Sequence, residues 1–304
     1  MNSATDKAPG GVTVGRTLAA ALVAFFLLAP GSRATAAATP SRLRSIVDDA
    51  SKALGQAERA VEGRDPGKVS LLLQRVDELL VSFQQASGLE ALVKAFDEGR
   101  TAARGSDMAA AAAAVRKASG LMSAVTDYVV LRQAAETSRS ALRAADVQDG
   151  PAFLEALDRF DSSILAPVLL ARVRDARDAV ARARQAMVRN NMPDGRARIA
   201  DARRAMNGLA YAGALSRASF SLAMGAELLE SRSVIAARDQ LQKALRDLKL
   251  AAQVGPDDSR PALEEARAQT VEIWKRSGHA AEGDASRLSD LVRKVDAIRL
   301  QQPR

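Results

Sequence analysis

Apolar side chains recur at alternating steps of three and four residues along most of the chain, as expected for helices with one apolar face. The clearest run extends from residue 169 to residue 187, with steps of 4, 3, 4, 3 and 4. A second run follows the polar turn at residues 190–195 and ends at Leu209. Residues 43–60 and 69–83 repeat this arrangement. Two apolar stripes on either side of a short turn predict a helical hairpin whose helices bury each other's stripes.

Glycines mark the turns between these runs at a nearly fixed interval, with a polar segment in place of one of them. The markers are Gly63, Gly105, Gly150, Gly195, the run Ser231-Arg232-Ser233 and Gly278. A unit that recurs at such a period is typical of a repeat architecture. The sequence therefore predicts an all-α protein of about six helical hairpins at a 42–45 residue period, with helix ends near these markers.

Six prolines lie in the predicted turns or between hairpins, where they avoid the cost of roughly 3 kcal/mol that a helix-interior proline carries. They are Pro66, Pro151, Pro167, Pro193, Pro256 and Pro261. Residues 109–145 and 196–230 contain only glycines as interruptions, so each segment is also compatible with one continuous helix. A helix of about 36 residues would span about 54 Å. We expect the hairpins to stack as an α-solenoid, and the alternative is a long-helix bundle.

The N-terminal residues 1–36 have the features of an export signal. Lys7 and Arg16 precede an uncharged stretch from Thr17 to Ser32, and small residues follow up to Ala36. This stretch would reach about 24 Å as a helix, short of the roughly 30 Å hydrocarbon core. We therefore expect cleavage near Ala36 and no transmembrane span after it.

The mature chain then divides into hairpins one to five at residues 37–254, a linker at 255–261 and a C-terminal hairpin at 262–304. The chain has no cysteine, which excludes disulfides, thiolate metal sites, cysteine nucleophiles and a lipid-modified cysteine. We expect a periplasmic or otherwise exported protein, with the thylakoid lumen as the lesser alternative.

Positive charge is concentrated in the fourth hairpin. Residues 165–217 hold eleven arginines against four aspartates, a net charge of +7, whereas the whole chain carries +8. Among the basic residues of the last hairpin, we expect four to be equally exposed: Arg287, Arg293, Lys294 and Arg299. Ten of the arginines form the candidate surface for an anionic partner: Arg172, Arg174, Arg177, Arg182, Arg184, Arg189, Arg196, Arg198, Arg203 and Arg204.

Such a surface suits lipid headgroups, lipopolysaccharide phosphates, an acidic protein or nucleic acid. Export and the lack of aromatic residues among the arginines argue against nucleic acid. The alternative is a solvated helix face, partly neutralised by pairs at i,i+4 spacing. The expected pairs are Asp178 with Arg182, Arg174 with Asp178, and Asp194 with Arg198.

The sequence offers no constellation for catalysis or metal binding. Residues 63–69 fail as a phosphate loop because the glycine spacing is one residue short and Val69 replaces the Ser or Thr that would reach magnesium. His279 is the only histidine, and it lies in the predicted turn at residues 277–280, so we expect a surface residue rather than a catalytic one. Trp274 is expected to pack in the core or cap the last hairpin. We therefore expect no enzyme, no cofactor and no metal site.

The fifth hairpin resembles a tetratricopeptide repeat, because Gly225 is followed by Ala237, Leu241 and Ala244 at offsets of 12, 16 and 19. We expect the other hairpins to keep the alternation of small and large residues without these offsets, and their period exceeds the family's period of about 34 residues. The alanine-rich hairpin array is also similar to the periplasmic YfdX type of stress-linked protein, and its basic, cysteine-free character is similar to PsbQ-like extrinsic photosystem subunits.

These resemblances imply an interaction scaffold or stress-related binding module with a protein partner or an anionic envelope component. The alternatives are a peripheral binder of anionic lipid or polyanion through a basic face, and a lumenal extrinsic subunit of a membrane complex. The oligomeric state stays open.

Overall fold

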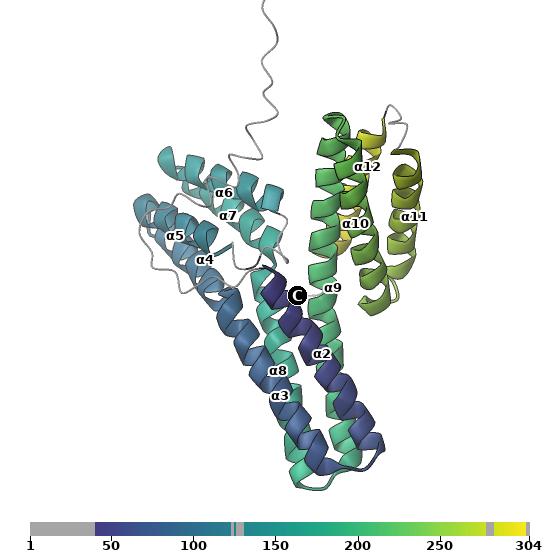
Figure 1. Cartoon of the computed structure of the whole chain (residues 1–304). Coiled ribbons are helices and arrows are strands. Elements are labelled where there is room, and N and C mark those ends of the chain that lie inside the picture. Colours follow the sequence, from purple (N-terminus) through teal and green to yellow (C-terminus); the bar gives the residue numbers. More distant parts are fainter. Residues whose placement is uncertain (1–39, 123–124, 126–130, 278–282, 302–304) are drawn as a thin grey trace, which may run out of the picture. The chain divides into compact units, whose positions relative to one another are not determined.

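The computed structural model describes residues 40–122, 125, 131–277 and 283–301. Within these ranges the protein consists of helices and their connections, with no strand (Figure 1). The chain divides into two units, Met1–Ala36 and Ala37–Arg304. The first unit lies outside the described residues, as does His279, so the export signal and the isolated histidine stay predictions.

Eleven helices form the described part of the chain. They are α2 (Pro40–Glu62), α3 (Pro66–Ser87), α4 (Leu89–Arg104), α5 (Met108–Leu121), α6 (Leu131–Asp146), α7 (Gly150–Ile164), α8 (Ala166–Val188), α9 (Met192–Glu230), α10 (Val234–Val254), α11 (Arg260–Arg276) and α12 (Asp284–Leu300). The predicted helix ends near Gly63, Gly105, Gly150, Gly195 and Ser233 are confirmed, and the predicted linker overlaps the break between α10 and α11. Six helices begin with a proline in their first turn, where its missing N–H costs nothing.

Five of the turns share one geometry. In each, one residue adopts a left-handed conformation with φ between 53° and 61°, and the next residue occupies the N-cap position of the following helix. These left-handed residues are Arg64, Ser106, Gln148, Asn190 and Arg232, and the interval between consecutive members is constant. The marker glycines Gly63, Gly105, Gly150 and Gly195 lie at different distances from this position, which is why their spacing varies.

When the hairpins are aligned on the left-handed residue of their turns, the same types of buried residue recur at the same positions. The glycines alone do not show this repeat. A buried small residue lies seven positions before it, at Ala57, Gly99, Ala141, Ala183 and Gly225. A fully buried aliphatic residue lies nine positions after it, at Leu73, Val115, Leu157, Ile199 and Leu241. The second hairpin has the same three offsets as the fifth, at Gly99, Ala111, Val115 and Ala118. The expectation that only the fifth hairpin keeps them is therefore wrong.

The small residue allows two helices to approach closely. A Cβ atom at Gly225 would lie 3.1 Å from Cδ2 of Leu241, and one at Gly99 would lie 3.2 Å from Cδ2 of Leu157. Both distances are shorter than ordinary van der Waals contacts, so a larger side chain would force the helices apart.

The hairpins pack as four-helix bundles. Helices α2, α3, α8 and α9 contact one another in a closed ring, the first bundle. Helices α4 to α7 form the second bundle in the same way, and α9 to α12 form the third. Of the two arrangements left open by the sequence, the contacts are those of bundles, because hairpin one pairs with hairpin four and not with its neighbour in sequence (Figure 1).

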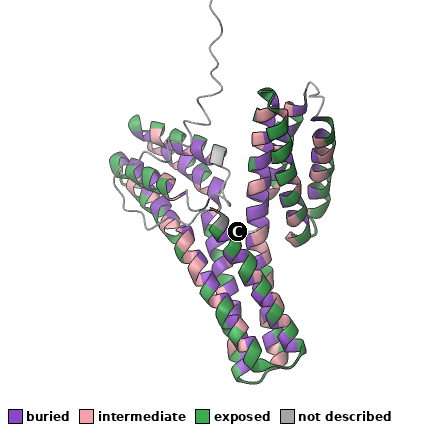
Figure 2. Cartoon of the chain, in the orientation of Figure 1, coloured by how far each residue is buried: buried purple, intermediate pink, exposed green. Residues whose placement is uncertain are grey.

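Helix α9 belongs to both the first and the third bundle. It runs without a break for 39 residues, about 58 Å, as the lack of a strong breaker between residues 196 and 230 permits. The other long segment, 109–145, is divided instead, since α5 ends at Leu121 and α6 begins at Leu131. Nearly all positions from Tyr211 to Ser219 are buried, because helices cover α9 on several sides there (Figure 2).

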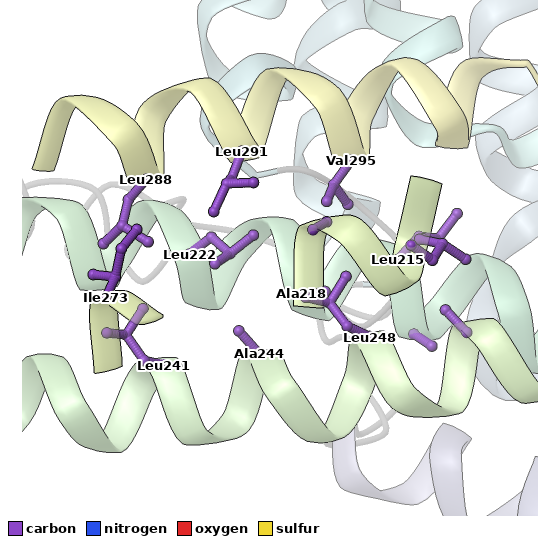
Figure 3. Close-up of a cluster of buried hydrophobic side chains, with 14 of the residues drawn as sticks. Leu215, Ala218, Leu222, Leu241, Ala244, Leu248, Ile273, Leu288, Leu291 and Val295 are labelled. Atoms are coloured by element: carbon purple, nitrogen blue, oxygen red, sulfur yellow. The ribbon is translucent and has the colours of Figure 1, made fainter. Parts of the chain in front are cut away.

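Leucines and alanines fill the core of the third bundle (Figure 3). The cluster of buried side chains includes Leu215 and Leu222 of α9, Leu241 of α10, and Leu288 and Leu291 of α12. Trp274 packs against this cluster, as predicted, and the guanidinium of Arg238 lies 4.9 Å from the centre of its ring.

Candidate functional site

The ten candidate arginines all lie on α8, on α9 or at the end of α8, and the structure divides them into two groups. Six of them contact other parts of the protein. The remaining four, Arg182, Arg184, Arg189 and Arg196, make no ion pair within the described residues.

Three arginines hold hairpin four against other hairpins. Arg177 donates to Asp77 at 3.0 Å and to Gln84 at 3.1 Å, both on α3. Arg203 lies 2.7 Å from Glu58 on α2. Arg174 lies 3.8 Å from Glu90 on α4. Partly exposed pairs of this kind each contribute about 0.2–1 kcal/mol, so these arginines mainly fix how the helices are placed.

Three more arginines are used within hairpin four. Arg198 lies 3.3 Å from Asp194 and 3.4 Å from Asp201, and Arg204 also pairs with Asp201. The guanidinium of Arg172 covers Gly208 on α9, where a Cβ atom would lie 2.2 Å from Nη1. Because Gly208 has no side chain, the guanidinium of Arg172 can lie against α9 at this position.

Of the three ion pairs expected at i,i+4 spacing, only Asp194 with Arg198 is confirmed. The pairs of Asp178 with Arg182 and of Arg174 with Asp178 are wrong, since neither forms among the described residues. Arg174 extends towards Glu90 of α4 instead. Arg182 and Asp178 are both exposed, where a pair gains little over hydration.

Arg182, Arg184, Arg189 and Arg196, the four arginines of the second group, surround the turn between α8 and α9. Within eight residues of Asn190 on either side there are five basic residues and one acidic residue, a net charge of +4. The same 17-residue window around the other four turns carries net charges of 0, 0, −2 and −1, in chain order. The basic character of the protein is therefore concentrated at one hairpin turn.

The turn between α2 and α3 lies at the same end of the first bundle. Asp77 pairs with Arg177. The number of residues from the left-handed Arg64 to Asp77 equals the number from Arg177 to the left-handed Asn190. Because the two helices are equally far from their turns where they meet, the turns lie at the same level, as Figure 1 shows.

Hairpin one adds three exposed basic residues to that end, Arg59, Arg64 and Lys68, which make no ion pair within the described residues. Together with Arg182, Arg184, Arg189 and Arg196 they form what we call the basic end. The acids nearby are Glu62, Asp65 and Asp194, of which Asp65 caps α3 through the backbone N–H of Lys68 and Asp194 pairs with Arg198. Sequence reasoning missed the contribution of hairpin one, because only the pairing of hairpins one and four brings these residues together.

In the second bundle, Arg100 is paired with acidic residues of a neighbouring helix. Arg100 of α4 lies 3.0 Å from Asp158 and 2.7 Å from Asp161, both on α7. Burial raises the pKa of Asp161, and the Arg100 guanidinium opposes that effect. Burial alone would lower the pKa of Arg100, but its bonds to the two aspartates raise it overall. This cluster joins α4 to α7, and the charge of Arg100 is used within the protein.

Arg299 is the largest fully buried side chain of the described residues, so the expectation that it is exposed is wrong. Its Nη1 donates to the backbone oxygen of Ser163, 2.8 Å away in the last turn of α7, where carbonyl groups lack helical partners and attract cations. Burial lowers the pKa of Arg299 and raises that of Asp296 one turn earlier. The residue links α12 to the second bundle.

An open cleft of about 620 Å³ lies between α4 and α8. Its charged residues pair with each other or with neighbours: Glu90 with Arg174, and Glu98 with Lys94 and Lys117. These residues of the cleft thus already have partners on the protein.

The described residues hold no cluster of three or more His, Cys, Asp or Glu side chains placed to bind a metal ion. None of the helices in the described ranges combines the length and hydropathy that a membrane crossing needs. Comparison of the chain with models of protein families, with curated proteins and with solved structures found no match.

Proposed function

We propose that this protein is a non-enzymatic, exported helical-repeat protein that acts as an interaction scaffold or stress-related binding module. Its contact surface is the basic end of the first bundle, and its partner is anionic. The observation that carries the proposal is the division of the ten arginines: six contact other parts of the protein, and the other four, Arg182, Arg184, Arg189 and Arg196, gather at one turn.

The charge distribution supports an electrostatic contact. An end that carries seven basic side chains attracts anions over a Debye length, about 10 Å at 0.1 M salt. The other hairpin turns are neutral or acidic, so the attraction also orients the protein. A protein partner or an anionic envelope component fits this role, and a nucleic acid does not fit an exported protein without stacking aromatics near the arginines.

The all-α hairpin repeat, which contains no cysteine, supports the proposal that the protein is a scaffold rather than an enzyme. The small and aliphatic residues at fixed offsets build rigid helical pairs, an arrangement suited to presenting a surface. The resemblance to tetratricopeptide repeats belongs to this proposal as a likeness of the hairpin unit.

The proposal is tested with two variants of the mature protein that each lose four positive charges. The basic-end variant is R182Q/R184Q/R189Q/R196Q. The control variant is R116Q/R143Q/R246Q/R287Q, whose arginines are exposed on helices away from that end. Gln forms helices nearly as well as Arg, so both variants should keep their helicity by circular dichroism.

Affinity capture from the envelope fraction at about 0.1 M salt should give the same retained components for the wild-type protein and the control variant, and lose them with the basic-end variant. At about 1 M salt, where the Debye length falls to about 3 Å, retention should decrease for all three. Equal retention by the two variants would contradict the proposal.

A further inference from the structure

We infer that the basic end docks on an anionic lipid bilayer, with its arginines on the lipid phosphates and Val188 inserted between headgroups. This inference rests on the proposed function and names the partner of that surface. It uses two observations: how the charges are spread, and which apolar side chain lies among them.

The positive side chains are spread over the ends of four helices. Arg59 and Arg64 come from the end of α2 and its turn, Lys68 from the first turn of α3, and the four free arginines from α8 and α9. They lie around two protruding turns rather than converging on one point. A fluid bilayer can contact basic side chains that are spread in this way, because its phosphates move to each guanidinium. An acidic protein would need carboxylates fixed at matching positions. Clusters of four to eight Lys and Arg residues are typical of anionic-lipid binding.

Arginine is the suitable residue for this contact. Its planar guanidinium binds phosphate oxygens through two parallel hydrogen bonds and is more weakly hydrated than an ammonium group. Six of the seven basic residues of this end are arginines.

Val188 provides the apolar contact. Its side chain is 84% exposed in the last turn of α8, next to Arg189. Val147 and Ile235 are similarly exposed, at 74% and 82%, at the turns of hairpins three and five. Those turns carry net charges of −2 and −1, so anionic lipid does not attract them. Among the five described turns, only that of hairpin four combines an exposed aliphatic residue with a positive net charge.

The experiment is co-sedimentation of the mature protein with vesicles of phosphatidylglycerol and phosphatidylcholine in equal parts, and with vesicles of phosphatidylcholine alone. The wild-type protein and the control variant should bind the anionic vesicles at about 0.1 M salt and not the neutral ones. Each basic residue near a bilayer contributes about fivefold in affinity, so the basic-end variant should bind roughly a few hundredfold more weakly.

Val188→Asn tests insertion, with Ile235→Asn as its matched control at a turn that is not basic. Val188→Asn should weaken vesicle binding at least about threefold, since the valine no longer leaves water on docking. Ile235→Asn should leave binding unchanged. Equal effects of the two substitutions would overturn the insertion.

The outcomes separate this inference from the proposed function. If the wild-type protein does not bind anionic vesicles, yet its capture of an acidic envelope protein is abolished by the basic-end substitutions, the lipid inference is overturned and the proposed function stands. Equal vesicle binding by the basic-end and control variants would overturn the lipid inference as well. If the basic-end substitutions leave both vesicle binding and envelope capture intact, both fail.

Discussion

The first and second bundles are built from the same repeating hairpin, yet they differ in where their charge goes. In the second bundle, hairpins two and three are neighbours in sequence, and Arg100 is held by Asp158 and Asp161 inside the contact between α4 and α7. In the first bundle, hairpins one and four come together from distant parts of the chain, and seven basic residues remain at one end. The repeating hairpin thus determines where the helices begin and end, whereas the pairing of hairpins determines which charged residues are left on the surface.

The largest expected effect concerns the α8 helix of the first bundle. Val180→Pro, in the middle of α8, should lower the free energy of unfolding by roughly 3 kcal/mol or more, because it removes a helical hydrogen bond and clashes with the preceding turn. Asp194→Pro should cost about 1 kcal/mol, since it removes only the N–H that Asn191 caps and the pair with Arg198. Urea unfolding measures both. Equal losses would mean that α8 does not run through residue 180.

A somewhat smaller effect should appear in the second bundle. Leu157 is fully buried against the helix that carries Gly99, so Leu157→Ala should cost about 2–4 kcal/mol through the lost apolar contact and the cavity left behind. Leu71→Ala, at a leucine that is 68% exposed on α3, is the control and should change stability by less than about 0.5 kcal/mol. If the two losses were similar, the contact between α4 and α7 would not hold the second bundle together.

The smallest effect is a pH dependence in the second bundle. Because burial raises the pKa of Asp161, the folded protein keeps that proton to a higher pH than the unfolded chain. The contribution of Asp161 to stability is therefore greatest below the unfolded value near 4, and it falls as pH rises through the folded pKa. Asp161→Asn should abolish this fall. Unfolding curves between about pH 3 and pH 6 measure it, and identical profiles for the variant and the wild-type protein would contradict the burial of this carboxyl.

The helix ends could be predicted from the sequence because glycine, proline and capping residues act locally. The constant register of the turns could not be read from the glycines, since the left-handed position is filled by arginine, serine, glutamine or asparagine. Nor could the sequence decide whether residues 196–230 form one helix or two. A segment that contains only weak helix breakers stays straight or bends according to the helices that pack around it.

The candidate surface was only partly predictable for a related reason. A count of charges locates hairpin four, but it does not separate Arg177 and Arg203, which pair with acids of hairpin one, from Arg182 and Arg189, which do not. Two whole hairpins separate those acids from the arginines in the sequence, so no local spacing reveals the pairs. Arg299 is the extreme case, since its partner is a backbone carbonyl in α7, for which no side-chain pattern gives a signal.

Helix α9 has a further consequence for how the molecule responds to force or heat. Its backbone hydrogen bonds continue from the basic end into the core around Leu215 and Leu222, so the first and third bundles share one structural element. Melting the middle of this helix removes packing surface from both bundles, so we expect the two to unfold as one cooperative unit. The second bundle joins the first through Gly88 and Leu165, two residues in the left-handed conformation, and neither connection is a continuous helix. Amide exchange should therefore show one shared opening free energy along α9 and a separate one for α4 to α7.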